Sequence, residues 1–251
     1  MTNSETAAAT SSAAELTPGG APCAPARETQ GVPRAEGAPT KTVLLCGVGG
    51  QGTILAADIL ARVAMAEGLD VKLSEIHGMA QRGGAVTTVV RIGEHVDSMV
   101  ADLGRADCIV AFETTEALRN AAFLRPGGVM LASDESIAPL PVLTGATTMP
   151  RGVRASLREM GAHLVPADLL ARQAGSAKAG NVVLLGALSA FLPYDAATWL
   201  DVVASRVPAK FKDVNLAAFS AGRASVAEAA EAWTAAQGAD EARSDGEGGA
   251  R

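Results

Sequence analysis

The amino-acid sequence predicts an α/β fold. We expect a three-layer sandwich in which a mostly parallel sheet is covered by helices on both faces, followed by a mostly helical C-terminal part. Short apolar runs of strand length alternate with segments of helical periodicity. Hydrophobic residues make up 48% of the chain but aromatic residues only 3%, a composition that suits strands buried on both faces. A G-x-G-x-x-G pattern stands between the first apolar run and the first helical segment.

The first three elements are a strand, a helix and a second strand. The run TVLLCG, which begins at Thr42, has the length and composition of a buried strand. In TILAADILARVAMAEG the apolar residues recur at helical spacing until Gly68, where glycine ends the helix. The run DVKLSE, from Asp70, predicts the second strand.

The middle of the chain predicts a hairpin and further strand–helix alternation. The segment AVTTVVRIGEHVDSMV indicates two strands joined by a turn at Gly93-Glu94. The runs ADCIVAF, VMLAS and AHLVP indicate buried strands, and TTEALRNAAFL and VRASLREMG indicate the helices between them. The glycines and proline of RPGG are expected to break the chain before VMLAS.

Beyond Ala167 the pattern is mostly helical. Helices are predicted in ADLLARQAG, NVVLLGALSAFL and AATWLDVVASRV, with a last helix from about Asn215 to Ala235. Asn181 opens the second of these helices and is expected to be its N-cap. Lys178, just before it, is placed to face an anion.

Both ends of the chain differ in composition from the part between them. Residues 1–40 are rich in Ala, Pro, Ser, Thr and Gly and have almost no large apolar side chains, so we expect a disordered tail. The end, QGADEARSDGEGGAR, has the same character and predicts a second tail at residues 237–251. The folded domain is therefore expected to span residues 41–236.

Charge, hydropathy and cysteine content exclude several classes of function. The formal net charge of -6 and the lack of a dense basic stripe argue against a nucleic-acid partner. The longest apolar run, Val182 to Leu192, is too short to span a bilayer, so no membrane partner is expected. The three cysteines Cys23, Cys46 and Cys108 are far apart and form no metal or cluster set. A reducing cytoplasm is the expected location, and no metal site is predicted on this chain.

The glycine loop GVGGQG is the first candidate binding site. Its glycines allow a tight turn and close backbone approach, and free N–H groups at the start of the helix attract an anion. Glu75, at the end of the second strand, is where a dinucleotide enzyme would hold a ribose hydroxyl. The alternative is a tight turn that needs glycine for packing alone. The candidate cofactor-binding residues are Gly47, Gly49, Gly50, Gln51 and Gly52.

The second candidate site is the stretch SEIHGMAQRGGAV, whose polar residues His77, Gln81 and Arg82 are the candidate catalytic set. Arg82 offers a fork of donors that suits a phosphate or a carboxylate, or else forms a structural ion pair with Glu75 or Asp97. His77 is suited to orienting a neighbour or shuttling a proton, and Gln81 both donates and accepts. The two loops follow strand ends and are expected to form one surface.

In this order and spacing, GVGGQG, HGMAQRGG, KAGNVVLLGAL and DVNLAAFSAG resemble the gamma-type component of the 2-oxoacid:ferredoxin oxidoreductases, over about Thr42 to Gly222. The resemblance implies a catalytic domain of this type at residues 41–236. It implies a complex that oxidatively decarboxylates a 2-oxoacid to an acyl-CoA and passes electrons to ferredoxin. Thiamine diphosphate, magnesium and iron–sulfur clusters are then expected on a larger alpha subunit, and coenzyme A is a substrate.

Within this family the resemblance favours indolepyruvate or another aryl pyruvate as the 2-oxoacid, although pyruvate and branched-chain enzymes share this component. Two other readings stay open. One is a free-standing NAD- or FAD-dependent enzyme. The lack of a second crossover helix after Glu75 argues against it. The other is a non-catalytic subunit whose loops only dock the partner.

Overall fold

The computed structural model describes residues 40–77, 84–138 and 140–247, and within them it contains one six-stranded sheet. The strand order is β2-β3-β1-β4-β5-β6. The strands are β1 (Lys41–Val48), β2 (Asp70–His77), β3 (Ala85–Gly93), β4 (Ala106–Ala111), β5 (Leu124–Ser133) and β6 (His163–Val165). The helices are α1 (Thr53–Ala66), α2 (Thr114–Asn120), α3 (Leu140–Leu143), α4 (Val153–Glu159), α5 (Ala167–Gln173), α6 (Gly180–Ser189), α7 (Ala196–Arg206), α8 (Lys212–Ala224) and α9 (Ala227–Glu247).

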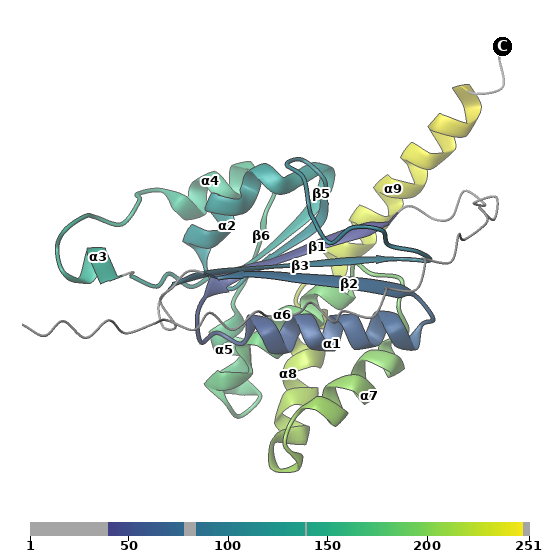
Figure 1. The fold of residues 1–251 in the computed structure, drawn as a ribbon. Coiled ribbons are helices and arrows are strands. Elements are labelled where there is room, and N and C mark those ends of the chain that lie inside the picture. Colours follow the sequence, from purple (N-terminus) through teal and green to yellow (C-terminus); the bar gives the residue numbers. More distant parts are fainter. Residues whose placement is uncertain (1–39, 78–83, 139, 248–251) are drawn as a thin grey trace, which may run out of the picture. The chain divides into compact units, whose positions relative to one another are not determined.

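The sheet is mostly parallel, as predicted. The pairs β1–β4, β4–β5 and β5–β6 are parallel, whereas β3 runs antiparallel to both of its neighbours, β1 and β2. Helices α2 and α4 cover one face, and α1, α6 and α8 lie on the other (Figure 1). The three-layer α/β sandwich with a helical C-terminal part is therefore confirmed.

Each face of the sheet has its own hydrophobic core. Successive residues of β1 point to opposite sides. Val43 and Leu45 enter the core under α1 and α6, whereas Leu44 and Cys46 enter the core under α2 and α4. The central strand is thus buried on both faces, which explains its unbroken apolar sequence.

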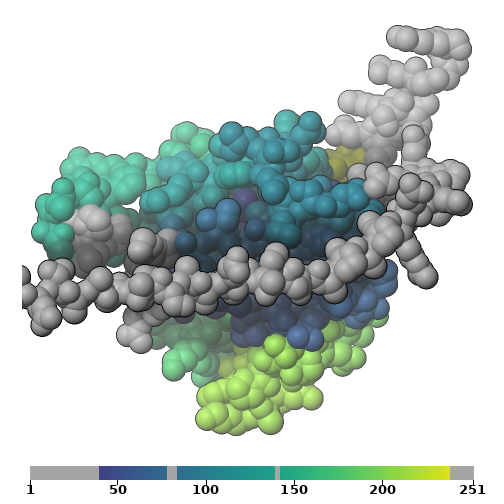
Figure 2. Space-filling model, in the orientation of Figure 1, coloured from purple at the N-terminus to yellow at the C-terminus, as the bar shows by residue number. Residues whose placement is uncertain are grey.

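On the face of the sheet that α1 and α6 cover, the helices also contact one another. Asp58 of α1 accepts from Arg206 of α7 over 2.7 Å. In the space-filling view, the dark blue surface of α1 adjoins the yellow-green helical surface beneath it (Figure 2). No helix within the described ranges is both long and apolar enough to cross a bilayer.

The predicted hairpin with a turn at Gly93-Glu94 is wrong. β3 ends at Gly93, and residues 94–105 form no strand. β3 instead pairs with β2 on one side and β1 on the other. The Arg91 guanidinium donates to the carbonyls of Ser98 and Val100, so these carbonyls are engaged by a side chain and not by a neighbouring strand.

Three further boundaries differ from the predictions. The RPGG segment lies inside β5, beside an irregularity of the β4–β5 pairing, and does not precede the strand. The single helix expected from Asn215 to Ala235 is two helices, α8 and α9. The second tail was expected from residue 237, a position that falls within α9. The expected tail at residues 1–40 lies outside the described residues except for Thr40.

The start of α2 contains two buried carboxylates. Glu113 caps the helix and accepts from the N–H groups of Thr115 and Glu116. Glu116 is only 4% exposed, and its Oε2 has no hydrogen-bond partner among the described residues. Burial raises the pKa of the Glu116 carboxyl; the charge of Arg119 opposes this shift and that of Glu113 adds to it.

We expect Glu116→Gln to stabilise the protein at neutral pH. Because the folded state raises this pKa above its ordinary value of 4.5, the carboxyl's contribution to stability is present below pH 4.5 and is lost as pH rises through the folded-state pKa. The difference in unfolding free energy between variant and wild type should therefore grow from pH 4.5 to neutral pH. Urea unfolding across this range measures it.

Glu228→Gln is the matched control, because Glu228 also lies in the first turn of a helix but is exposed. Its unfolding free energy relative to wild type should change little over the same pH range. Equal pH profiles for the two variants would contradict the assignment to Glu116.

Candidate functional site

The glycine loop connects the carboxyl end of β1 to the amino end of α1. Gly50 and Gly52 have φ of 102° and 84°, in the left-handed region that side chains rarely adopt. Gly52 occupies the N-cap position of α1, and its carbonyl accepts from the Ala56 N–H over 3.1 Å. Two of the three glycines of the motif, Gly47 and Gly52, also lack room for a side chain.

Gln51 holds this loop in shape. Its Oε1 accepts from the Val48 N–H over 2.7 Å, and its Nε2 donates to the Phe112 carbonyl over 2.9 Å. A Cβ at Gly47 would lie 2.7 Å from Gln51 Oε1 and 2.8 Å from Phe112 Cβ. Gln51 was predicted to bind a cofactor, and both polar ends of its side chain bond the protein's own backbone.

The glycine loop meets the second candidate stretch at the same edge of the sheet. The Gly49 N–H donates to the Gly84 carbonyl over 2.9 Å. His77 is the last residue of β2, pairs with Val86 and is exposed. Gln81 and Arg82 lie outside the described residues, within 78–83. The described ends of the two stretches are therefore adjacent, and the single surface expected of the two loops stays a prediction.

A crevice of about 350 Å³ opens beside the glycine loop. It lies at the carboxyl ends of β1, β4 and β5, where ligand sites of α/β sheets form. The far wall comes from the segments after β5 and β6 and from the start of α6. The charged and polar side chains of its lining are Gln51, Ser133, Glu135, Asp168, Lys178 and Asn181.

Asn181 is not the N-cap that the sequence predicted. α6 begins at Gly180, and Ala179 occupies the N-cap position. The Asn181 side chain instead lies over the glycine loop, so that a Cβ at Gly52 would be 2.5 Å from its Nδ2. Lys178, in the short 3-10 helix Ala177–Ala179, is exposed in the crevice and has no carboxylate partner among the described residues.

Glu135 and Asp168 add negative charge to the same crevice. Burial raises the pKa of the Glu135 carboxyl, and the nearby charge of Asp168 raises it further. Asp168 also forms an ion pair with Arg172 over 2.7 Å. Sequence reasoning missed these two carboxylates, because they follow different strands and meet only in the folded sheet.

The crevice therefore combines two kinds of chemistry. The N–H groups at the start of α1 and the Lys178 ammonium suit an anion such as a phosphate group. The Glu135 carboxyl, whose pKa burial and Asp168 raise, holds a proton more readily than an ordinary carboxyl and is a candidate for proton transfer.

The sheet order separates this site from a dinucleotide-binding fold. The neighbour of β1 on this side is the antiparallel β3, and β2 lies beyond it at the edge. In a dinucleotide fold the second strand lies parallel and next to the first, which brings its terminal acid to the ribose. Glu75 pairs with Thr88 of β3 and does not line the crevice.

Comparison with known proteins agrees with this architecture. Residues 42–225 match the family described as pyruvate ferredoxin/flavodoxin oxidoreductase. The chain is 38% identical over 192 residues to the indolepyruvate oxidoreductase subunit IorB of Thermococcus kodakarensis, covering 72% of this chain and 93% of the relative. It is 30% identical over 185 residues to the ketoisovalerate oxidoreductase subunit VorA of Methanothermobacter marburgensis, covering 72% of this chain and 35% of that relative.

A solved structure shows the same fold. The gamma subunit of a keto/oxoacid ferredoxin oxidoreductase from Geobacter sulfurreducens superposes with a TM-score of 0.56 and 26% identity, covering 75% of this chain and 99% of that subunit. The chain belongs to the pyruvate ferredoxin/flavodoxin oxidoreductase family. The family resemblance identified from the sequence motifs is confirmed.

Proposed function

We propose that this chain is the small subunit of a 2-oxoacid:ferredoxin oxidoreductase, working with a larger subunit that holds thiamine diphosphate, magnesium and iron–sulfur clusters. The observation that carries this proposal is the family match over residues 42–225, to which the crevice adds a site of suitable chemistry. Indolepyruvate or another aryl pyruvate is the proposed 2-oxoacid, since relatives such as IorB carry that name. Ferredoxin is the proposed electron acceptor.

The donor groups of this chain suit a division of labour between subunits. Cys46 and Cys108 lie in different cores, and burial raises the pKa of both thiols, that of Cys108 to about 12. Neither thiol is therefore suited to bind a cluster as a thiolate. Among the residues that the structure describes, no three His, Cys, Asp or Glu side chains gather as a metal site.

In the proposed reaction, a phosphate group of coenzyme A binds in the crevice beside the glycine loop. This crevice, at the carboxyl ends of β1, β4 and β5, is called the carboxyl-edge crevice below. The N–H groups at the start of α1 and the Lys178 ammonium bind the anion, while Gln51 keeps the loop open for its approach. His77 and the stretch through Arg82 are proposed to complete this surface toward the partner subunit.

Reconstitution tests the proposal. The chain and its larger partner together should reduce ferredoxin with indolepyruvate and coenzyme A, and neither should do so alone. Pyruvate, ketoisovalerate and 2-oxoglutarate, tested in parallel, assign the substrate. Full activity of the larger subunit alone would refute the proposal, and tight binding of NADH or FAD by the isolated chain would favour the dinucleotide reading.

Arg82→Ala separates a catalytic contribution from docking. If Arg82 contacts coenzyme A or the reacting groups, the assembled complex should lose turnover by about tenfold or more, as expected for one charge-assisted contact. Assembly, measured by co-purification and by subunit ratio, should then be unchanged. Weakened assembly with normal turnover per assembled complex would instead assign Arg82 to docking.

A further inference from the structure

A cavity of about 990 Å³ lies at the other edge of the sheet, where β1, β4 and β5 begin. Lys41, the first residue of β1, lines it, whereas the carboxyl-edge crevice lies beyond Val48, the last. Eight residues of strand separate these ends by about 23 Å. This amino-edge cavity is therefore a different site from the one proposed for coenzyme A, and its occupant is independent of that proposal.

One wall of the amino-edge cavity is α9, which is fastened to the start of β5. Trp233 Nε1 and Gln237 Nε2 both donate to the Gly127 carbonyl, over 3.0 and 3.2 Å. Arg125 donates to Gln237 Oε1 over 3.3 Å and forms an ion pair with Asp107 over 2.7 Å. These bonds fix the Trp233 ring at the cavity without any ligand.

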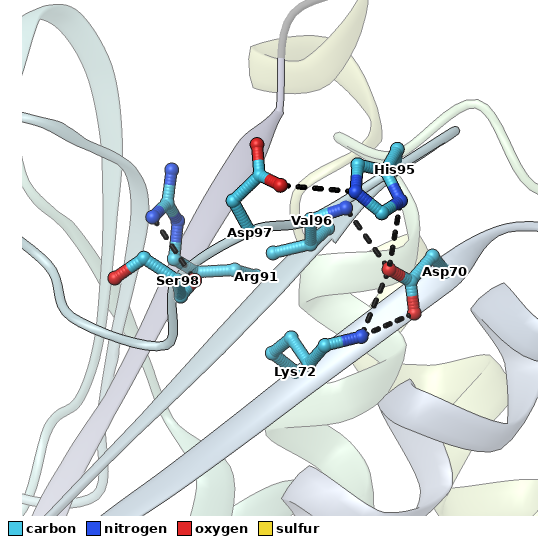
Figure 3. A network of polar contacts seen from close by, with 7 residues as sticks. All are labelled: Asp70, Lys72, Arg91, His95, Val96, Asp97 and Ser98. Atoms are coloured by element: carbon cyan, nitrogen blue, oxygen red, sulfur yellow. Dashed lines mark hydrogen bonds and ion pairs between the residues drawn. The ribbon is translucent and has the colours of Figure 1, made fainter. Parts of the chain in front are cut away.

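Another part of the lining is the segment after β3, which is held by a polar network (Figure 3). Asp70 Oδ2 accepts from the Val96 N–H over 2.9 Å, and His95 pairs with Asp97 over 2.9 Å. Arg91 donates to the Ser98 carbonyl over 3.0 Å. The wall that carries Val100 to Arg105 is thus anchored to the sheet at several points.

The charge inside the cavity is unbalanced. Among the described residues, the side chains of Lys41, Arg91 and Arg105 have no carboxylate partner. Arg91 Nε is buried without a hydrogen-bond partner there. Asp107 is engaged by Arg125, which leaves Asp102 as the opposing carboxylate of the lining. Three cations without a carboxylate partner in one cavity of a chain with net charge -6 favour an anionic ligand.

The apolar part of the lining includes two aromatic side chains, Phe191 and Trp233. Trp233 is half-buried and meets Phe191 edge to face, with ring centroids 5.7 Å apart. Leu192 and Pro193 continue this surface. An aromatic ring of a ligand can pack against the half-buried Trp233, and the cations without a carboxylate partner can contact phosphate groups attached to it.

We propose that the amino-edge cavity binds a nucleoside phosphate, with its base against Trp233 and its phosphate groups facing Lys41 and Arg105. The volume is within the range of sites for ligands of this size. The proposal assigns this chain a second ligand site, at the opposite ends of the strands from the glycine loop.

Tryptophan fluorescence of the full-length chain tests the proposal with ADP as the probe. The chain has two tryptophans, and Trp199 is fully buried, so saturable quenching is expected to come from Trp233. Trp233→Phe should abolish the signal. Lys41→Gln combined with Arg105→Gln should weaken ADP binding by about tenfold or more, because two charge-assisted contacts are removed.

Arg151→Gln with Arg158→Gln is the charge-matched control, since both arginines are exposed, lie outside the cavity and have no carboxylate partner among the described residues. This pair should leave ADP affinity nearly unchanged. If the variant that combines Lys41→Gln with Arg105→Gln does not fold, Arg105→Gln alone replaces it in the test, because Arg105 is exposed. No saturable quenching at millimolar ADP would overturn the proposal. So would an equal loss in both charge variants, or binding of adenosine or pyrophosphate as tight as that of ADP.

Discussion

Alanine at Gly186 or at Gly222 is expected to destabilise the protein by roughly 3 kcal/mol or more, at the upper end of overpacking effects. The two glycines lie where α6 crosses α8. A Cβ at Gly186 would overlap the carbonyl of Phe219, and a Cβ at Gly222 would overlap the carbonyl of Val183. Because these obstacles are backbone atoms, no side-chain rotation relieves the overlap, and the helices must separate.

Urea unfolding of the purified chain measures this effect. Gly180→Ala is the matched control, since Gly180 also lies in α6 but has no atom within 4 Å of its Cβ position. Its replacement should be neutral or stabilising by about 0.5 kcal/mol, as expected for glycine to alanine at a compatible helical site. Similar unfolding midpoints for Gly180→Ala and Gly186→Ala would contradict the close crossing.

Gly52→Ala is expected to raise the KM for coenzyme A in the assembled complex by about tenfold or more, with a smaller effect on kcat. This prediction rests on the proposed function. The residue has a φ of 84°, where a side chain costs about 1–2 kcal/mol. Its new Cβ would also lie 2.5 Å from Asn181 Nδ2, so the loop or the Asn181 side chain must move within the crevice.

Two variants separate the effect of backbone strain at Gly52 from the effect of displacing the Asn181 side chain. Gly50→Ala carries comparable backbone strain, with φ of 102°, but no atom lies within 4 Å of its Cβ position. It should therefore raise the KM less. Asn181→Ala, added to Gly52→Ala, removes the overlap and should recover part of the affinity. Equal KM values for Gly50→Ala and Gly52→Ala, unaffected by Asn181→Ala, would show that displacement of Asn181 plays no part.

The sequence carried enough local information for the layered fold and for the glycine loop. Buried parallel strands are nearly continuous apolar runs, and β1 and β4 are recognisable for that reason. The G-x-G-x-x-G pattern was informative because it stood between a strand and a helix. Gly50 and Gly52 have the positive φ that makes glycine necessary there.

What the sequence could not predict depends on contacts between distant residues. The segment after Gly93 has strand-like residues, but Arg91 and Asp70 hold it as a wall of irregular structure. Asn181 has the character of an N-cap, yet its position over Gly52 follows from the packing of α6 against the loop. Glu135 and Asp168 belong to the crevice only because successive strand ends lie side by side.

The two hydrogen bonds of the Gln51 side chain have a consequence for the thermodynamics of ligand capture. They fix the loop between β1 and α1 before any ligand arrives. Conformational entropy that a mobile loop would lose on association is then already lost on folding. We therefore expect a ligand to meet a preorganised surface, with little rearrangement of this loop between the free and the bound subunit.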